Sequence, residues 1–322
     1  MKIVILHTAD ALEPRDPLLD QLDDALRAAS HETSFVALGT DVGEVVRSLQ
    51  SAAPELVFNV AESFDGRSAL ESSVAGLLNL LKLRYTGSSP AGLLMAGDKS
   101  LTKKLLGFHG IQSPAFTTMW RGAVDWSGEL QFPLIVKPPQ EDASIGITSA
   151  SVVHDLKELF GQMDALQTEF RSPVLVEQYV EGREFYVGVL GNVDAVALPI
   201  IELDFTGFPD DRPRIASWDA KWEEADAEYK GTRSVFAEGL DEALAARMQQ
   251  VALDAFHALR LRDYARIDLR VTDAGEIYVI EVNPNCYLER EAEFCRAAAK
   301  VGTEYPALVA RIVELASARY AR

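Results

Sequence analysis

The first sixty residues alternate short apolar runs with amphipathic segments. The runs KIVIL, SFVAL and ELVFNV are typical of buried strands, and a segment with helical periodicity separates each from the next. The first helix is predicted to begin at Pro17, because Asp16 offers an N-cap and proline is favoured at the first helical position. This strand–helix alternation predicts a small parallel sheet, whose ligands lie beyond the carboxyl ends of its strands.

The pattern changes after the turn YTGSS. Residues 68–83 before it are predicted to be helical, and a second helix is predicted over 98–110 after it. A strand FPLIVKPP, a loop, a strand ITSASVV, a helix from Asp155 to about Phe170 and a strand PVLVEQYV then follow in that order. We interpret this order as a separate compact unit.

The remainder of the chain is predicted to be an antiparallel sheet with helices. REFYVGVLG and DAVALPIIEL begin the sheet, and a helix over 241–261, a hairpin and two terminal helices end the chain. Between them, residues 206–238 carry two prolines and many charges, and they are predicted to form a long irregular loop. Loops of that length are uncommon unless they are functional or mobile.

Two polar pairs interrupt the hairpin ARIDLRVTDAGEIYVIEVNPN, residues 265–285. Arg266 and Asp268 lie two apart on its first strand, as Glu281 and Asn283 do on its second, so each pair shares a face. The turn TDAG joins the strands and lets the two pairs meet. Three oxygen ligands on one side of a hairpin suit a hard cation such as Mg²⁺. A solvated sheet face is the plainer alternative.

Composition narrows the class of protein. A chain of 322 residues that is 48% hydrophobic can bury sizeable cores, and two or three domains are expected. The net charge of −18 disfavours nucleic acid or an anionic membrane surface as the main partner. Two cysteines, Cys286 and Cys295, make no disulfide framework or zinc spacing. The short apolar start and the lack of an apolar run of membrane-spanning length favour a cytoplasmic protein.

Three lysines stand out in this acidic chain. Lys99 lies early in a predicted helix, Lys137 ends an apolar strand, and Lys221 lies in the long loop. An amine at the end of a buried strand is costly without an anionic partner. The small residues Ser144 and Gly146 in the loop after Lys137 would let backbone N–H groups approach phosphate oxygens. No P-loop motif is present, so this loop alone is a weak sign of a phosphate site.

Glutamates mark the segment VLVEQYVEGREF. Glu177 interrupts an apolar strand, and Glu184 follows just after a turn. Free backbone groups of such a strand at a domain junction could bind an adenine edge, and Glu184 could accept bonds from ribose hydroxyls. The alternative is an ordinary edge strand with surface glutamates.

Taken together and in order, these segments resemble the ATP-grasp superfamily, and most closely the D-alanine–D-alanine ligase family. The matching stretches are YTGSSPAGLLMAGDKSLTKKLL, PLIVKPPQEDASIG, VLVEQYVEGREFYVGVLG, WDAKW and RIDLRVTDAGEIYVIEVNPN. They extend from about Phe58 to Asn285. The resemblance implies an α/β (α+β) ATP-grasp fold with a Rossmann-like domain over 1–95, a central subdomain over 96–180 and a C-terminal subdomain with a metal site over 181–322.

The resemblance also implies roles for individual residues in binding ATP. Lys99 and Lys137 would hold phosphates under the loop of Ser144 and Gly146, and Lys221 would reach the γ-phosphate. The adenine pocket and the ribose would be contacted by Glu177, Gln178, Tyr179, Val180 and Glu184.

The hairpin residues would form the metal and catalytic centre. By resemblance, Asp268, Glu281 and Asn283 would hold two Mg²⁺ ions, with Mn²⁺ as an alternative. Arg266 would stabilise charge on the transferring phosphoryl group and on the tetrahedral intermediate. Phosphoryl transfer needs such cations around developing charge and little covalent chemistry by the protein.

The acceptor half departs from the family. Glu13 stands where the ligases begin a hydrogen-bonded triad, but the other two positions are Ala143 and Trp222, which have no side-chain acceptor. The family's histidine aligns with Glu62, the glycine of its Pro-Gly pair with Tyr287, and a serine that binds the second substrate falls near Ala292. We interpret these changes as altered substrates. Cys286 is interpreted as a packing thiol rather than a nucleophile.

The sequence therefore predicts an ATP- and Mg²⁺-dependent carboxylate–amine ligase that acts through an acyl phosphate on small-molecule substrates. The acidic residues around the presumed acceptor pocket would suit an amine or a cationic group. Two alternatives stay open, namely a nucleotide-binding regulatory protein without ligase activity and a kinase that stops at the phosphorylated acid. The family resemblance suggests a homodimer.

Overall fold

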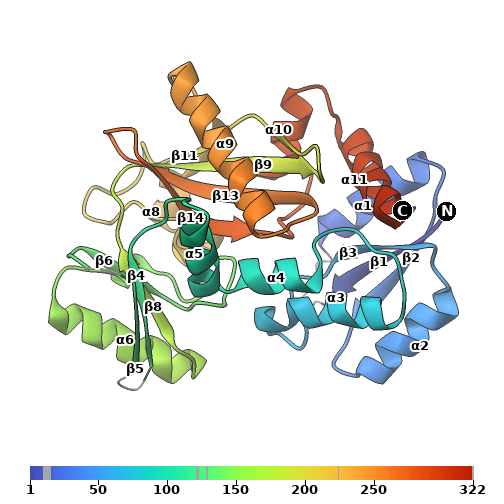
Figure 1. Cartoon of the computed structure of the whole chain (residues 1–322), viewed down its shortest axis with the longest axis horizontal. Coiled ribbons are helices and arrows are strands. Elements are labelled where there is room, and N and C mark those ends of the chain that lie inside the picture. The colour runs from blue at the N-terminus through green and yellow to red at the C-terminus, as the bar shows by residue number, and fades with distance from the viewer. Residues whose placement is uncertain (10–15, 121–122, 128–129, 224, 321–322) are drawn as a thin grey trace.

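Three β-sheets follow one another along the chain (Figure 1). The structure, a computed structural model, describes residues 1–9, 16–120, 123–127, 130–223 and 225–320. Each of the predicted domains, 1–95, 96–180 and 181–322, contains one of the sheets. The domain boundaries themselves stay a prediction.

The first sheet is parallel, with the strand order β2-β1-β3, as predicted. Its strands and crossover helices are β1 (Lys2–Thr8), α1 (Pro17–Ala28), β2 (Glu32–Leu38), α2 (Val42–Ala52) and β3 (Leu56–Val60). Asp16 caps α1 by accepting a hydrogen bond from the backbone N–H of Leu18 at 2.8 Å, so the predicted helix start is confirmed. Next come a short 3-10 helix η1 (Ser68–Leu70), α3 (Glu71–Leu80) and α4 (Pro90–Gly97).

The middle sheet is antiparallel, with the order β5-β4-β8-β6-β7. Its elements are α5 (Lys99–Phe108), β4 (Phe116–Trp120), β5 (Ala123–Ser127), β6 (Leu134–Lys137), η2 (Ser149–Ser151), β7 (Val152–Val153), α6 (Leu156–Phe170) and β8 (Val174–Gln178). The predicted strand over ITSASVV is wrong for most of its length. Reciprocal side-chain bonds of Thr148 and Ser151 close a 3-10 turn there, which leaves two residues for β7.

The third sheet has the order β12-β11-β9-β13-β14, with β10 beside β9. Its strands are β9 (Arg183–Gly191), β10 (Val196–Ala197), β11 (Ile201–Asp204), β12 (Arg233–Phe236), β13 (Asp263–Val271) and β14 (Ile277–Asn283). The three longer helices of this part of the chain are α9 (Glu242–Ala258), α10 (Glu293–Lys300) and α11 (Tyr305–Tyr320). None of the helices in the described ranges combines the length and apolar character that a membrane crossing requires.

Strand alternation divides the third sheet into two faces. Phe185 and Ile267 pack with α9 in one core, while Tyr186 and Tyr264 lie in another core that also holds residues of β1, α1, α10 and α11. Figure 1 shows α9 lying along the sheet and α11 beside α1. Because Arg266 and Asp268 alternate with the residues of the α9 core, they lie on the opposite face.

The predicted long loop is wrong in part. Residues 206–238 contain α7 (Trp218–Trp222), α8 (Ala227–Gly231) and β12. Glu228 is fully buried at their centre and accepts hydrogen bonds from Arg212 at 2.8 Å and from the hydroxyls of Ser217 and Ser149. A single buried carboxylate therefore joins Arg212 and Ser217 of this segment to Ser149 of the middle unit.

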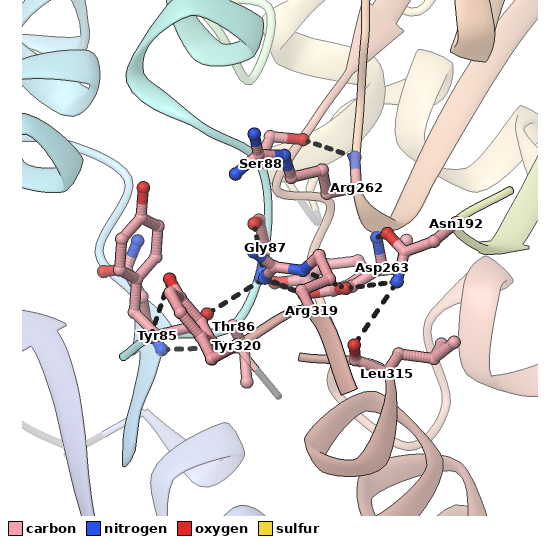
Figure 2. A network of polar contacts seen from close by, with 12 residues as sticks. Tyr85, Thr86, Gly87, Ser88, Asn192, Arg262, Asp263, Leu315, Arg319 and Tyr320 are labelled. Carbon is pink, nitrogen blue, oxygen red and sulfur yellow. Dashed lines mark hydrogen bonds and ion pairs between the residues drawn. The ribbon is translucent and has the colours of Figure 1, made fainter. Parts of the chain in front are cut away.

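A polar network around Asp263 joins the first and third sheets (Figure 2). Asp263 is fully buried, has a positive φ of 65°, and accepts hydrogen bonds from the Gly87 N–H at 2.8 Å and the Asn192 amide at 3.0 Å. The Arg319 guanidinium donates to both of its oxygens at 3.0 and 2.7 Å. Arg319 also donates to the carbonyl of Tyr85 at 3.0 Å, so α11 is tied to the segment that follows the first sheet. We call these residues the Asp263 network.

Candidate active site

The polar pairs of the hairpin meet as the sequence predicts. In the β13–β14 ladder, Arg266 pairs with Asn283 and Asp268 pairs with Glu281, and a register shift follows directly after Asp268. The Asn283 amide donates to Asp268 at 3.1 Å. A bulge changes the direction in which the side chains beside it point. This irregularity therefore lies at a position where it can orient side chains for a functional site.

Most of the predicted site residues line one cavity between the middle and third sheets. They are Lys137, Ser144, Glu177, Gln178, Tyr179, Val180, Glu184, Lys221, Asp268 and Glu281. Ile135, Ile147, Ile215 and Ile280 add apolar walls. A cavity with apolar walls and a few convergent charged groups is the usual form of a small-molecule site.

Lys99 reaches this cavity through its contact with Glu281. Its ammonium lies 2.8 Å from Oε1 of Glu281 and 3.6 Å from Asp142, and it donates to the backbone carbonyl of Glu141 at 2.6 Å. Burial lowers the pKa of Lys99, but Glu281 and Asp142 outweigh it and leave the pKa above its ordinary value. Burial likewise raises the pKa of Glu281, while Lys99, Lys221 and Lys137 bring it down to about 2.

Glu177 is shared by two buried lysines. Lys137 pairs with its Oε1, and Lys103 lies 2.7 Å from its Oε2. Burial raises the pKa of Glu177, but Lys103 and Lys137 outweigh this and hold the pKa below its ordinary value. The sequence reasoning missed Lys103. Its position four residues after Lys99, on the same helix face, is the signal that could have found it.

The strand end around Glu177 is partly engaged within the protein. The backbone N–H of Gln178 donates to the Ala115 carbonyl at 2.8 Å, and that of Tyr179 donates to the Pro133 carbonyl at 3.1 Å. These two N–H groups are therefore not available to an adenine edge. The predicted adenine contacts of Gln178 and Tyr179 would have to use other atoms.

Glu184 is buried and paired with an arginine that the sequence reasoning missed. The Arg270 guanidinium lies 2.8 Å from Glu184 and donates to the Gly182 carbonyl at 3.0 Å. The Tyr186 hydroxyl donates to the other oxygen of Glu184 at 3.1 Å. Arg270 follows Asp268 by two residues on β13, so strand alternation could have placed it on the site's face.

Arg266 is fixed from three sides. It donates to both oxygens of Asp268, at 2.8 and 2.9 Å, and lies 3.4 Å from the carboxylate of Glu293 on α10. The guanidinium also lies over the ring of Tyr186, 4.5 Å from its centroid. Burial lowers the pKa of Arg266, but Asp268 and Glu293 raise it well above its ordinary value, so the group stays charged. No sequence signal pointed to Glu293.

The loop after Lys137 is bonded to the segment that carries Lys221. The Ser144 hydroxyl donates to the Ala216 carbonyl at 2.6 Å, and the Trp222 indole N–H donates to the Ala143 carbonyl at 3.0 Å. Gly146 has a φ of 74°, and a Cβ there would lie 2.8 Å from the side chains of Pro138 and Phe170, so only glycine fits without a shift. Because Ala143 has no side-chain acceptor, the indole of Trp222 bonds to the backbone carbonyl of Ala143 instead.

Two of the predicted acceptor residues, Tyr287 and Glu62, lie near the elements of the first sheet. Tyr287 donates from its hydroxyl to Asp16 at 2.7 Å, Glu62 is exposed just after β3, and Glu13 lies outside the described residues. Ala292 is the N-cap of α10 and makes no side-chain cap bond. Cys286 is buried, and burial raises the pKa of its thiol to about 12, which agrees with a packing role.

A buried carboxyl at this end of the site was not predicted. The Asn285 amide donates to Glu71 at 3.0 Å, and the Tyr264 hydroxyl donates to the Asn285 oxygen at 2.6 Å. Burial, and after it Asp142, raises the pKa of Glu71 well above its ordinary value. The surroundings of Glu71 therefore disfavour the ionised form of its carboxyl group.

The hairpin oxygens form the candidate metal centre. Within the described ranges, no group of three or more His, Cys, Asp or Glu side chains is arranged to hold a metal ion. Asp268 and Glu281 are backbone partners in the β13–β14 ladder, and the Asn283 amide donates to Asp268. The two carboxylates and the amide oxygen of Asn283 make an oxygen-only donor set. Such a set fits a hard cation that takes its other ligands from phosphate and water. The roles of the individual site residues stay predictions.

Comparisons with known proteins identify the family of this chain. A family model described as "D-ala D-ala ligase C-terminus" matches residues 108–314. The D-alanine–D-alanine ligase of Syntrophotalea carbinolica is 34% identical over 92% of this chain and 90% of its own length. That of Aquifex aeolicus is 31% identical over 90% and 91%. The uncharacterized protein y4sG of Sinorhizobium fredii is 30% identical over 95% and 89%.

A solved structure shows the same fold. The D-alanine–D-alanine ligase from Bacillus anthracis complexed with ATP superposes with a TM-score of 0.73 at 22% identity, covering 98% of this chain and 97% of that chain. The predicted α/β ATP-grasp fold is thereby confirmed. From the family model and the ligase relatives, we conclude that the chain belongs to the D-alanine–D-alanine ligase family and is an ATP-grasp enzyme.

Proposed function

We propose that this enzyme is an ATP- and Mg²⁺-dependent carboxylate–amine ligase. The observation that carries the proposal is that Lys137, Lys221, Glu184, Asp268 and Glu281 line one cavity. These are the residue types that phosphates, ribose and a hard cation require. The Bacillus anthracis ligase of the same fold was solved with ATP, and that supports ATP as the co-substrate here.

The proposed reaction has two steps. A carboxylate oxygen of the acid attacks the γ-phosphorus of ATP, ADP leaves, and an acyl phosphate forms. The amine nitrogen then attacks the acyl carbon, the C–N bond forms as phosphate leaves, and the nitrogen loses a proton. Lys99, Lys137 and Lys221 would balance the phosphate charges. Arg266, fixed between Asp268 and Glu293, would face the charge that develops during both steps.

The metal is proposed from the donor set. Asp268, Glu281 and Asn283 would hold Mg²⁺, as two ions by family resemblance, with Mn²⁺ as the alternative. When bound, such ions supply positive charge to the phosphate oxygens. The lysines around Glu281 hold its pKa at about 2, so its carboxylate is ionised and competent as a ligand at neutral pH.

The substrates are proposed to differ from two D-alanines. Trp222 and Ala143 stand at the positions of the family's triad, and Ala292 has no hydroxyl for a substrate carboxylate. Tyr287 stands where the ligases have glycine, and its hydroxyl is bonded to Asp16. These residues support a different acid or amine, with the acyl phosphate chemistry unchanged.

An ADP-release assay across a panel of amino acid pairs tests the function, with Glu281→Gln as the inactive control. We expect at least one pair to stimulate ADP release and to give an amide product. ATP binding without stimulation by any acid would favour a regulatory protein, and a released acyl phosphate without amide would favour a carboxylate kinase.

Light scattering of the same sample would measure whether the protein is the homodimer that the resemblance implies.

A further inference from the structure

Two buried ammonium groups share one carboxylate at the end of the candidate nucleotide cavity. Lys103 on α5 and Lys137 at the end of β6 both contact Glu177 on β8. The side chains of Lys103, Lys137 and Glu177 are 2%, 8% and 3% exposed. Charges that are removed from water to this extent persist only when they are paired, so the ratio of two cations to one anion needs an explanation.

The two lysines are not equivalent. Lys137 lines the cavity, as Glu177 does, whereas Lys103 is not among the lining residues. Lys103 lies behind Glu177, with its ammonium 5.9 Å from the centroid of the Phe116 ring. A ligand in the cavity can therefore contact Lys137 and Glu177, while Lys103 acts on the ligand only through Glu177.

We propose that Lys103 is a positioning residue that neutralises Glu177 and so frees Lys137 for a nucleotide phosphate. The inference rests on the proposed function, because it needs ATP as the ligand. In this structure Lys137 is paired with Glu177. A phosphate that takes Lys137 leaves Glu177 with Lys103 as its counter-ion, so no buried carboxylate is left uncompensated. Without Lys103, a phosphate would have to compete with Glu177 for its last cation.

The test compares ATP binding by Lys103→Met and Lys104→Met. Lys104 is the adjacent lysine on the exposed side of α5, and it serves as the matched control. Isothermal titration calorimetry with ATP and Mg²⁺ is expected to show a dissociation constant about tenfold higher for Lys103→Met and changed less than twofold for Lys104→Met. In the ADP-release assay, the KM for ATP should rise by the same factor while kcat at saturating ATP stays within about threefold.

A double variant separates positioning from a general structural role. In a Glu177→Gln background the competing carboxylate is gone, so adding Lys103→Met should change the dissociation constant by less than twofold. A tenfold loss that persists in that background overturns the proposal. Lys103→Gln, which keeps a polar side chain of similar length, repeats the measurement if Lys103→Met does not fold. The same tenfold rise is expected of it, and an unchanged affinity overturns the proposal.

The wild-type protein distinguishes this inference from the proposed function. Failure of the wild type to bind ATP overturns the proposed function, and the role of Lys103 with it. Wild-type binding that Lys103→Met and Lys103→Gln reproduce unchanged overturns the role of Lys103 alone.

Discussion

Replacing Arg319 with methionine is expected to lower the free energy of unfolding by about 3 kcal/mol. The Arg319 side chain is 15% exposed, and its partner Asp263 is fully buried. The substitution removes two hydrogen bonds to Asp263 and one each to the Tyr85 and Gly87 carbonyls. Breaking a buried ion pair by removing one partner costs about 3–5 kcal/mol, because the remaining charge is uncompensated. Asp263 keeps its bonds from Gly87 and Asn192, so we expect the lower end.

Urea unfolding followed by circular dichroism measures the loss, and the same helix offers a control. Arg311 on α11 pairs with Glu314 at 3.2 Å, but both side chains are more than half exposed. Exposed pairs contribute about 0–1 kcal/mol, so Arg311→Met should be nearly neutral. The difference between the two variants isolates the effect of burial, because both remove one guanidinium from the same helix.

Two results would refute this reasoning. The first is an unfolding free energy for Arg319→Met within about 1 kcal/mol of that for Arg311→Met. The second comes from adding Asp263→Asn to Arg319→Met. Asparagine tolerates the positive φ of this position and carries no charge, so the double variant should recover part of the loss. A further loss would show that the buried charge is not the cause.

Three more predictions concern the candidate active site. Trp222→Phe removes the indole bond to the Ala143 carbonyl, worth about 0.5–1.5 kcal/mol, so the ADP-release assay should show a KM for substrate raised up to about tenfold; unchanged kinetics would contradict this. Glu71 has a raised pKa, so it contributes stability at low pH that is lost as the pH rises through that pKa. The side chain of the Glu71→Gln variant cannot ionise, so its melting temperature relative to that of the wild type should rise between pH 5 and pH 8. A difference in melting temperature that stays constant over this range would contradict the burial effect. Burial raises the pKa of the Cys286 thiol to about 12, so iodoacetamide at pH 8 should alkylate it in urea but not in the native protein, as mass spectrometry would show; rapid native alkylation would exclude this assignment.

The sequence predicted those parts of the fold that depend on local rules. The cap at Asp16, the alternation of the first three strands and the meeting of Asp268 with Glu281 each follow from residues a few positions apart or joined by a tight turn. Such rules depend on residues that are close in the sequence and do not need tertiary contacts, so their patterns can be recognised in one sequence. The family resemblance then implied how these segments are arranged in the ATP-grasp fold.

The elements that escaped prediction depend on distant partners. Helix α7 has only five residues, too few to be stable alone, and it forms where Ser217 bonds to the buried Glu228. The β4–β5 hairpin likewise needs β8 beside it. In the site, Arg270 pairs with Glu184, which lies 86 positions earlier in the chain. Arg266 on β13 contacts Glu293, which lies on α10. Strand alternation can place Arg270 on a face of its strand, but periodicity and spacing do not identify the distant partner of either arginine.

The segment that carries Lys221 also carries two of the four tryptophans of the chain. Trp218 and Trp222 are partly exposed, and their rings lie 5.8 Å apart with a 42° tilt. Trp222 is bonded to the loop after Lys137, so any movement of either segment changes the surroundings of this indole pair. The protein therefore contains its own optical reporter. Its intrinsic emission, recorded by stopped flow after mixing with ATP, would report any movement of these two segments without an attached dye.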